Sequence, residues 1–239
     1  MSPLFEELDY RPTPIGALAL RRRRLLALDV DVFEIILGDE HLMSSLFTAS
    51  EIALAQLGLD ACTGEALDVV VGGLGLGCTA KAALDHPRLG SLAVVEMLEP
   101  VLDWHREGLL PLGAELTADA RCRFVQGDFF ALAQGSTGFE GERPARYLDA
   151  ILVDIDHTPD ALLDERSTSF YATPGLTALA GHLKPGGIFG LWSDAREDGA
   201  FTERLKSVFA EAWAEPVTFH NPLQDKPFTQ TVYLARKGG

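Results

Sequence analysis

The chain has 239 residues, 47% of them apolar, and a formal net charge of −15 at pH 7. This length suits one large α/β domain, or a small appendage followed by one domain. Because so negative a chain repels polyanions, the charge argues against nucleic-acid binding and favours small or cationic substrates.

Three cysteines are scattered along the chain, and their spacing fits neither a disulfide framework nor a metal site. No apolar run approaches the ~18–20 residues that a membrane span needs, and the acidic N-terminus is unlike a signal peptide. We therefore expect a cytoplasmic protein with no metal and no membrane partner.

Residues 1–47 predict a small N-terminal β-hairpin region, because extended runs occupy 17–20 and 30–37. Four arginines at 21–24 lie between these runs, and we expect a solvated hairpin there, with a nucleic-acid patch as the alternative. Thr48 or Ser50 then begins a helix that runs through Leu57 and ends at Gly58.

Strands and helices alternate through much of the remainder, 48–239, which predicts a doubly wound, mostly parallel, Rossmann-like domain. The predicted strands are 67–71, 92–97, 123–125, 150–153 and 188–192. The predicted helices are 79–85, 99–107, 174–183 and 199–212.

A glycine-rich turn, Gly73-Leu74-Gly75-Leu76-Gly77, connects the first of these strands to the first helix. Glycines at 73, 75 and 77 let the backbone turn sharply and approach a ligand without a Cβ in the way. Since Cys78 stands where a dinucleotide fingerprint needs a third glycine, the loop fits an adenosyl-methionine site better.

Two carboxylates downstream are placed to hold a nucleoside. Glu96 ends the second strand about 20 residues after the loop, where an acid can accept both ribose hydroxyls; an ordinary strand-end acid is the alternative, and Glu99 is a nearby competitor. Asp128 follows the third strand and can accept from the adenine amino group while Phe129 covers the ring. Asp128 can also cap a helix, and both roles can hold at once.

The fourth strand ends at Asp154, and Asp156 and His157 follow it. A carboxylate at this edge can hold a cationic amine, take its proton and stabilise positive charge on sulfur. We expect Asp154 to point into the cleft, and His157 is either an ordinary loop residue or a proton carrier. The outer acids, which we expect in a solvated loop, are Asp160, Asp164 and Glu165.

A mobile surface loop is expected over 134–146, which contains three glycines and a proline. Lys184-Pro185-Gly186-Gly187 predicts a helix stop and a tight turn into a buried strand. The last two predicted strands, 217–219 and 231–234, have no helix between them. By analogy of fold, an antiparallel terminal hairpin is typical of adenosyl-methionine-dependent transferases.

From about residue 30 to 195 the chain resembles the spermidine synthase-like (polyamine aminopropyltransferase) branch of these transferases. The motifs that carry the resemblance are Gly73-Leu74-Gly75-Leu76-Gly77, Val94-Val95-Glu96, Gly127-Asp128, Tyr147-Leu148-Asp149-Ala150-Ile151-Leu152-Val153-Asp154 and Leu183-Lys184-Pro185-Gly186-Gly187. The resemblance implies that Glu96 holds the ribose, Asp128 the adenine amine and Asp154 the amine to be alkylated. It also implies decarboxylated S-adenosylmethionine as the donor and a place in polyamine biosynthesis.

The chain departs from this family at four positions. Leu76 stands where the family carries an aspartate that pairs with the donor amine, and Ser45 replaces a donor-contacting glutamine. The family's Asp-Glu-x-x-Tyr-x-Glu helix keeps only Glu51. The second aspartate of the Asp-Ser-Ser-Asp-Pro motif has moved to Asp156.

The first functional hypothesis is aminopropyl transfer to a small amine, in which Asp154 orients and deprotonates the amine and Asp156 helps to hold positive charge. Methyl transfer from intact S-adenosylmethionine to a small molecule is the alternative that Leu76 favours. Val71 argues against it, because methyltransferases usually carry an acid at that position. A non-catalytic nucleoside-binding homologue and a homodimer formed through the N-terminal region stay open.

Overall fold

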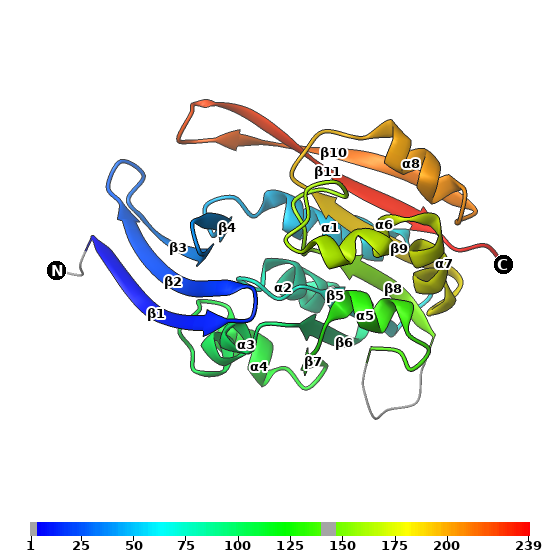
Figure 1. Cartoon of the computed structure of the whole chain (residues 1–239), viewed down its shortest axis with the longest axis horizontal. Coiled ribbons are helices and arrows are strands. Elements are labelled where there is room, and N and C mark those ends of the chain that lie inside the picture. The colour runs from blue at the N-terminus through cyan, green and yellow to red at the C-terminus, as the bar shows by residue number, and fades with distance from the viewer. Residues whose placement is uncertain (1–3, 140–146) are drawn as a thin grey trace.

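The computed structural model describes residues 4–139 and 147–239, which form two β-sheets with helices around the larger one (Figure 1). The smaller sheet is antiparallel, and its strands follow one another in chain order. Its strands are β1 (Phe5–Thr13), β2 (Gly16–Leu25), β3 (Val30–Leu37) and β4 (Glu40–Ser44). The predicted N-terminal β region is thus a four-stranded sheet.

The larger sheet has the strand order β10-β11-β9-β8-β5-β6-β7. Five neighbouring strands pair in parallel, whereas β11 pairs antiparallel with both β9 and β10. This confirms the predicted doubly wound sheet with an antiparallel C-terminal hairpin. Its strands are β5 (Leu67–Gly72), β6 (Leu89–Glu96), β7 (Cys122–Gln126), β8 (Leu148–Val153), β9 (Leu183–Ser193), β10 (Glu211–Asn221) and β11 (Lys226–Arg236).

Helices cover both faces of this sheet, because its central strands are apolar on both sides. On β5, Val69 and Val71 pack into the core under α1 to α4, while Val70 packs into the core under α5 to α8. No helix within the described residues is long and apolar enough to cross a membrane. The helices are α1 (Ala49–Ala61), α2 (Cys78–Asp85), α3 (Glu99–Arg106), α4 (Gly113–Ala118), α5 (Phe129–Gln134), α6 (Thr168–Tyr171), α7 (Thr173–Gly181) and α8 (Gly199–Lys206), with a short 3-10 turn at Glu165–Ser167.

Helix α1 is longer than predicted, because Gly58 lies inside it rather than at its end. Thr48 occupies the N-cap position, although its side chain makes no capping hydrogen bond. A Cβ on Gly58 would lie 2.6 Å from Cδ2 of Leu152 on β8. The glycine therefore permits close packing of the helix on the sheet and does not break the helix.

The helix predicted over 199–212 is wrong in its second part. Helix α8 ends at Lys206, and β10 begins at Glu211, opposite Arg236 of β11. The hairpin strands are longer than predicted because they pair along their whole length, including exposed polar positions that carry no clear pattern.

The run Arg21–Arg24 lies within β2 and pairs with residues 31–34 of β3, so it forms part of a hairpin, as predicted, with the arginines half-buried. Each of the four guanidinium groups is ion-paired with an acid of the same sheet or its turns. Arg21 pairs with Glu7, Arg22 with Glu6, Arg23 with Glu34, and Arg24 with both Asp29 and Asp31. Because these acids neutralise the arginines locally, the run is not an isolated cationic patch.

Part of the predicted loop over 134–146 falls on residues 140–146, which lie outside the described residues. Before them, Phe139 is buried against Phe129, with the two rings stacked at 5.2 Å. Residues 134–137 are exposed, as predicted for a surface loop, whereas Phe139 belongs to the core.

The small sheet is fastened to helix α3 by polar contacts. The Arg11 guanidinium donates to Asp103 Oδ2 (2.7 Å), and the indole nitrogen of the fully buried Trp104 donates to Asp9 Oδ2 (2.6 Å). These contacts hold the small sheet beside the carboxyl ends of the large sheet's strands.

Candidate functional site

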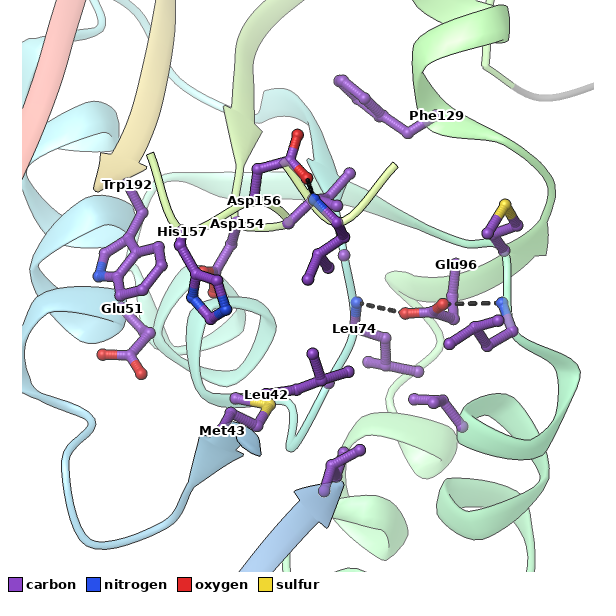
Figure 2. Close-up of a pocket in the computed structure, with 18 of the residues that line it drawn as sticks. Leu42, Met43, Glu51, Leu74, Glu96, Phe129, Asp154, Asp156, His157 and Trp192 are labelled. Carbon is purple, nitrogen blue, oxygen red and sulfur yellow. Dashed lines mark hydrogen bonds between the residues drawn. The ribbon is translucent and has the colours of Figure 1, made fainter. Parts of the chain in front are cut away.

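A cavity of about 580 Å³ lies at the carboxyl ends of the parallel strands, between the two sheets (Figure 2). The loops after β5, β7 and β8 and the end of β6 form one wall, and β4 contributes Leu42 and Met43 to the other. Ligands of open α/β sheets bind at this edge. The predicted residues Glu96, Asp128 and Asp154, brought from three different strands, all line the cavity.

The glycine loop is positioned where two neighbours approach it closely. Gly73 has φ +91°, and a Cβ there would lie 2.1 Å from the backbone oxygen of Asp154. Gly75 has φ +46°, and its Cβ would lie 2.3 Å from Met43 Sδ. Both positions line the cavity, so the predicted need for glycine has a physical cause in each case.

The second part of the loop faces away from the cavity. Gly77 (φ +90°) is the N-cap of α2 and packs against His105 and Leu116. Leu76 is only 3% exposed, and its amide donates to Met43 Sδ (3.1 Å). Leu76, which stands where the family that the sequence resembles carries an acid, is therefore a core side chain.

Glu96 ends β6 and is 9% exposed. Its two carboxylate oxygens accept hydrogen bonds from the amides of Leu74 (3.0 Å) and Leu98 (2.8 Å), as Figure 2 shows. Burial raises the pKa of Glu96, although these backbone amides oppose the effect. The amides of Gly75 and Met97 act on the same carboxylate, so Glu96 lies within a group of backbone N–H donors at the end of β6.

Asp128 caps helix α5, as one of its two predicted roles requires. Its Oδ1 accepts from the amides of Phe130 (2.9 Å) and Ala131 (3.2 Å). Phe129 is buried in the core yet also borders the cavity. Capping through Oδ1 leaves the second oxygen of Asp128 as the one suited to a ligand.

Asp154 and Asp156 differ in what their oxygens contact. Asp154 Oδ2 accepts from the hydroxyl of Thr79 (2.6 Å), and burial raises the pKa of Asp154 to about 6. Asp156 is 1% exposed and accepts from the Tyr171 hydroxyl and the Leu163 amide, both at 2.8 Å. Asp156 thus anchors the loop after β8, whereas Asp154 lines the cavity with its Oδ2 held by Thr79.

The outer residues of this loop make local contacts. His157 lies 3.0 Å from Glu40 at the start of β4, which links the two sheets across the cavity. Asp164 accepts from the Arg166 amide (2.9 Å) and pairs with its guanidinium, and Asp160 is exposed.

Four further polar residues of the cavity lie on distant segments: Glu51 on α1, Trp192 on β9, Asp194 after it, and Gln230 on β11. Glu51 is 6% exposed, and burial together with the nearby Asp154 raises its pKa to about 7. Glu51 is the one residue kept from the family's helix motif, but the sequence alone predicted no role for it. The other three carry no local motif of their own at these positions, so only the fold brings them together.

Among the residues that the structure describes, no group of three or more histidine, cysteine, aspartate or glutamate side chains is arranged to hold a metal ion. What the cavity offers is a ring of carboxylates, apolar side chains and backbone amides.

No protein-family model matches the chain. Its structure is similar to that of a spermidine synthase in complex with the transition-state analogue AdoDATO, with a TM-score of 0.74, 15% identity, and 97% of this chain and 74% of that one covered. It is also similar to the spermidine synthase from Thermotoga maritima, with a TM-score of 0.72, 15% identity, and coverage of 97% and 72%. The chain therefore has a spermidine synthase-like fold.

Proposed function

Because the chain shares the fold of spermidine synthases over nearly its whole length, we propose that it is a transferase that moves an aminopropyl group from decarboxylated S-adenosylmethionine to a small amine. The observation that carries this proposal is the carboxylate of Asp154. It lies in the cavity beside the glycine loop, with one oxygen held by Thr79.

In the proposed step, the lone pair of the amine attacks the aminopropyl carbon next to the sulfonium. The C–N bond forms, the C–S bond breaks, its electron pair returns to sulfur, and a proton passes from nitrogen to Asp154. A carboxyl with a pKa of about 6 is mostly ionised at neutral pH and can accept that proton. Buried Asp156 adds negative charge nearby, and positioning of the two substrates is worth ~7–11 kcal/mol.

The nucleoside end of the donor would lie along the other wall of the cavity. There Glu96 would accept from the ribose hydroxyls and Asp128 from the adenine amine, with Phe129 beside the ring. Gly73 and Gly75 would let the loop approach the sulfur. Gly77, which supports the loop from behind, would act only through the loop's shape.

Methyl transfer from intact S-adenosylmethionine is the second candidate. The observation that favours it is the apolar lining next to the loop, where Leu42, Met43 and Leu74 border the cavity and Leu76 is turned into the core. A donor that keeps its carboxylate meets no acid from the loop itself.

The decisive experiment supplies each donor with a panel of mono- and diamines and identifies products by mass spectrometry. We expect aminopropylated product, reduced at least ~10²-fold in Asp154→Asn and unchanged in Asp160→Asn, which removes an exposed acid of the same loop. Methylated product from the intact donor would establish the second candidate instead. Donor binding without transfer would indicate a non-catalytic homologue, and binding of neither donor would refute the nucleoside site.

A further inference from the structure

Ser50, on the first turn of α1, has three hydrogen-bond partners at the back of the cavity. Its Oγ lies 2.8 Å from Glu51 Oε2, 2.5 Å from Gln230 Oε1 and 2.8 Å from the indole nitrogen of Trp192. The Trp192 N–H can only donate. It therefore occupies one lone pair of the serine oxygen.

The other two contacts cannot both be made with the single proton of the serine hydroxyl. Gln230 Oε1 and an ionised Glu51 are both acceptors, and Ser50 can donate to one of them only. The remaining contact would then bring two oxygen lone pairs together at hydrogen-bond distance. A proton on Glu51 removes the conflict, because Glu51 then donates to Ser50 while Ser50 donates to Gln230.

Rotating the Gln230 amide does not provide the missing donor. Its Nε2 donates to Asp194 Oδ1 at 2.5 Å. If the amide oxygen and nitrogen exchanged places, the Gln230 N–H could donate to Ser50. The amide oxygen would then lie against the Asp194 carboxylate, and both of these groups are acceptors. The conflict would only move from one end of the side chain to the other.

We infer that Glu51 is a positioning residue that carries a proton in the resting site, which leaves Asp154 as the ionised member of the pair. The need for a proton rests on the hydrogen-bond geometry, whereas its catalytic meaning rests on the proposed transfer to an amine. Thr79 completes the arrangement: its hydroxyl lies 2.6 Å from Asp154 Oδ2 and 3.2 Å from the Glu51 backbone oxygen. The shorter contact directs its proton to Asp154.

The titratable groups around Glu51 favour the same state. Asp154 at the end of β8 and Asp194 after β9 both raise the pKa of Glu51, and burial adds the largest effect. On α2, burial raises the pKa of the Cys78 thiol to about 12, so this neighbour stays neutral. Burial and the two acids outweigh the hydrogen bonds from the Ser50 side chain and the Glu51 backbone, which lower the pKa of Glu51.

This arrangement determines the charge that an incoming amine meets. With Glu51 neutral, the inner end of the cavity offers one carboxylate from the pair, enough to bind one ammonium group and then take its proton. A second ionised carboxylate would stabilise the ammonium form and oppose formation of the nucleophile. A protonated Glu51 therefore removes one negative charge from the carboxylates that surround the amine, and Asp154 is left as the group that takes its proton.

The test is a titration of the ligand-free protein labelled with ¹³C at its glutamate carboxyls. We expect one carboxyl with a midpoint near pH 7 in the unmodified protein, and its loss in Glu51→Gln. In Gln230→Met the serine proton has lost its competing acceptor, so the midpoint of Glu51 should fall toward the ordinary range. A Glu51 midpoint in that ordinary range in the unmodified protein, or one unmoved by Gln230→Met, would overturn the inference.

A kinetic readout tests the catalytic meaning separately. Ionisation of Glu51 should add a downward inflection near pH 7 to the profile of kcat/KM, and Glu51→Gln should remove it. Glu65→Gln, the same change at an exposed position, should leave the profile as it is. Persistence of the inflection in Glu51→Gln would refute the role. Absence of any transfer, with the titration as expected, would refute the proposed function alone.

Discussion

Glu96 is a buried side chain that both holds the glycine loop and lines the cavity. Its carboxylate holds the amides of Leu74 and Leu98, and these lie on either side of the end of β6. Loss of this carboxylate would release the glycine loop and remove the proposed acceptor of the ribose hydroxyls together.

We expect Glu96→Ala to lower donor affinity by about 1.5–3 kcal/mol, the range for hydrogen bonds to a charged group. Glu96→Gln should lose less, because its amide oxygen can still accept one of the bonds. Calorimetric titration with the donor measures both effects. Glu99→Ala, an exposed acid three residues further along, is the control, and undiminished binding by Glu96→Ala would exclude Glu96 from the site.

The position of a single residue could be predicted where the residues next to it in the sequence determine its role. Asp128 precedes an apolar helical run, so its capping role could be read directly, and Glu96 followed from its distance to the glycine loop. Gln230 and Trp192 could not be identified, because their polar ends meet Ser50 across separations of 180 and 142 residues. Only the order of β8, β9 and β11 in the sheet brings them together.

At the scale of elements, the glycine loop is a tight junction between β5 and α2. We expect Gly73→Ala to destabilise the fold, because its φ of +91° costs on the order of 1–3 kcal/mol for a residue with a side chain. The clash with the Asp154 backbone oxygen adds to that cost. Urea denaturation measures the change, and equal stability of the two proteins would contradict it.

Gly199→Ala is the matched control for this substitution. Gly199 begins α8, has no positive φ, and has nothing within 4 Å of its added Cβ. The same chemical change should therefore be close to neutral there, which separates backbone strain from a general effect of replacing glycine.

Element types were easier to predict than element boundaries. The buried parallel strands were found because continuous apolar runs identify them, and β5 is the clearest case. Gly58 was misread as a helix end because its real constraint, contact with Leu152 of β8, comes from a distant part of the chain. The short helix α4, with six residues, offered too little periodicity to be recognised.

At the scale of the whole molecule, buried acids determine how stability depends on pH. Folding raises the pKa of Glu51 from 4.5 to about 7 and that of Asp154 from 3.8 to about 6. Between the unfolded and folded pKa values of each group, the folded state binds more protons than the unfolded state. The free energy of unfolding should therefore fall as pH rises through this range. Groups with lowered pKa values, such as Glu34, act in the opposite direction, chiefly at more acidic pH.

We therefore expect the urea midpoint to decrease between about pH 4.5 and pH 7. The double variant Glu51→Gln/Asp154→Asn should show a flatter profile over the same range. High salt serves as the control, because it screens repulsion among the exposed charges of this −15 chain but affects buried groups much less. A midpoint that rises across this range would contradict the expectation.

In the small sheet, the residues that attach it to α3 are different from the residues that border the cavity. Asp9 and Arg11 hold the sheet in place, and Leu42 and Met43 of β4 border the cavity opposite the carboxylates of the large sheet. Leu42 therefore shapes this wall of the cavity, whereas Met43 also supports the glycine loop by accepting from the Leu76 amide. The small sheet is also joined to the rest of the protein through Leu18, Leu20 and Ile35, which pack into the shared core, so its position fixes this wall of the cavity.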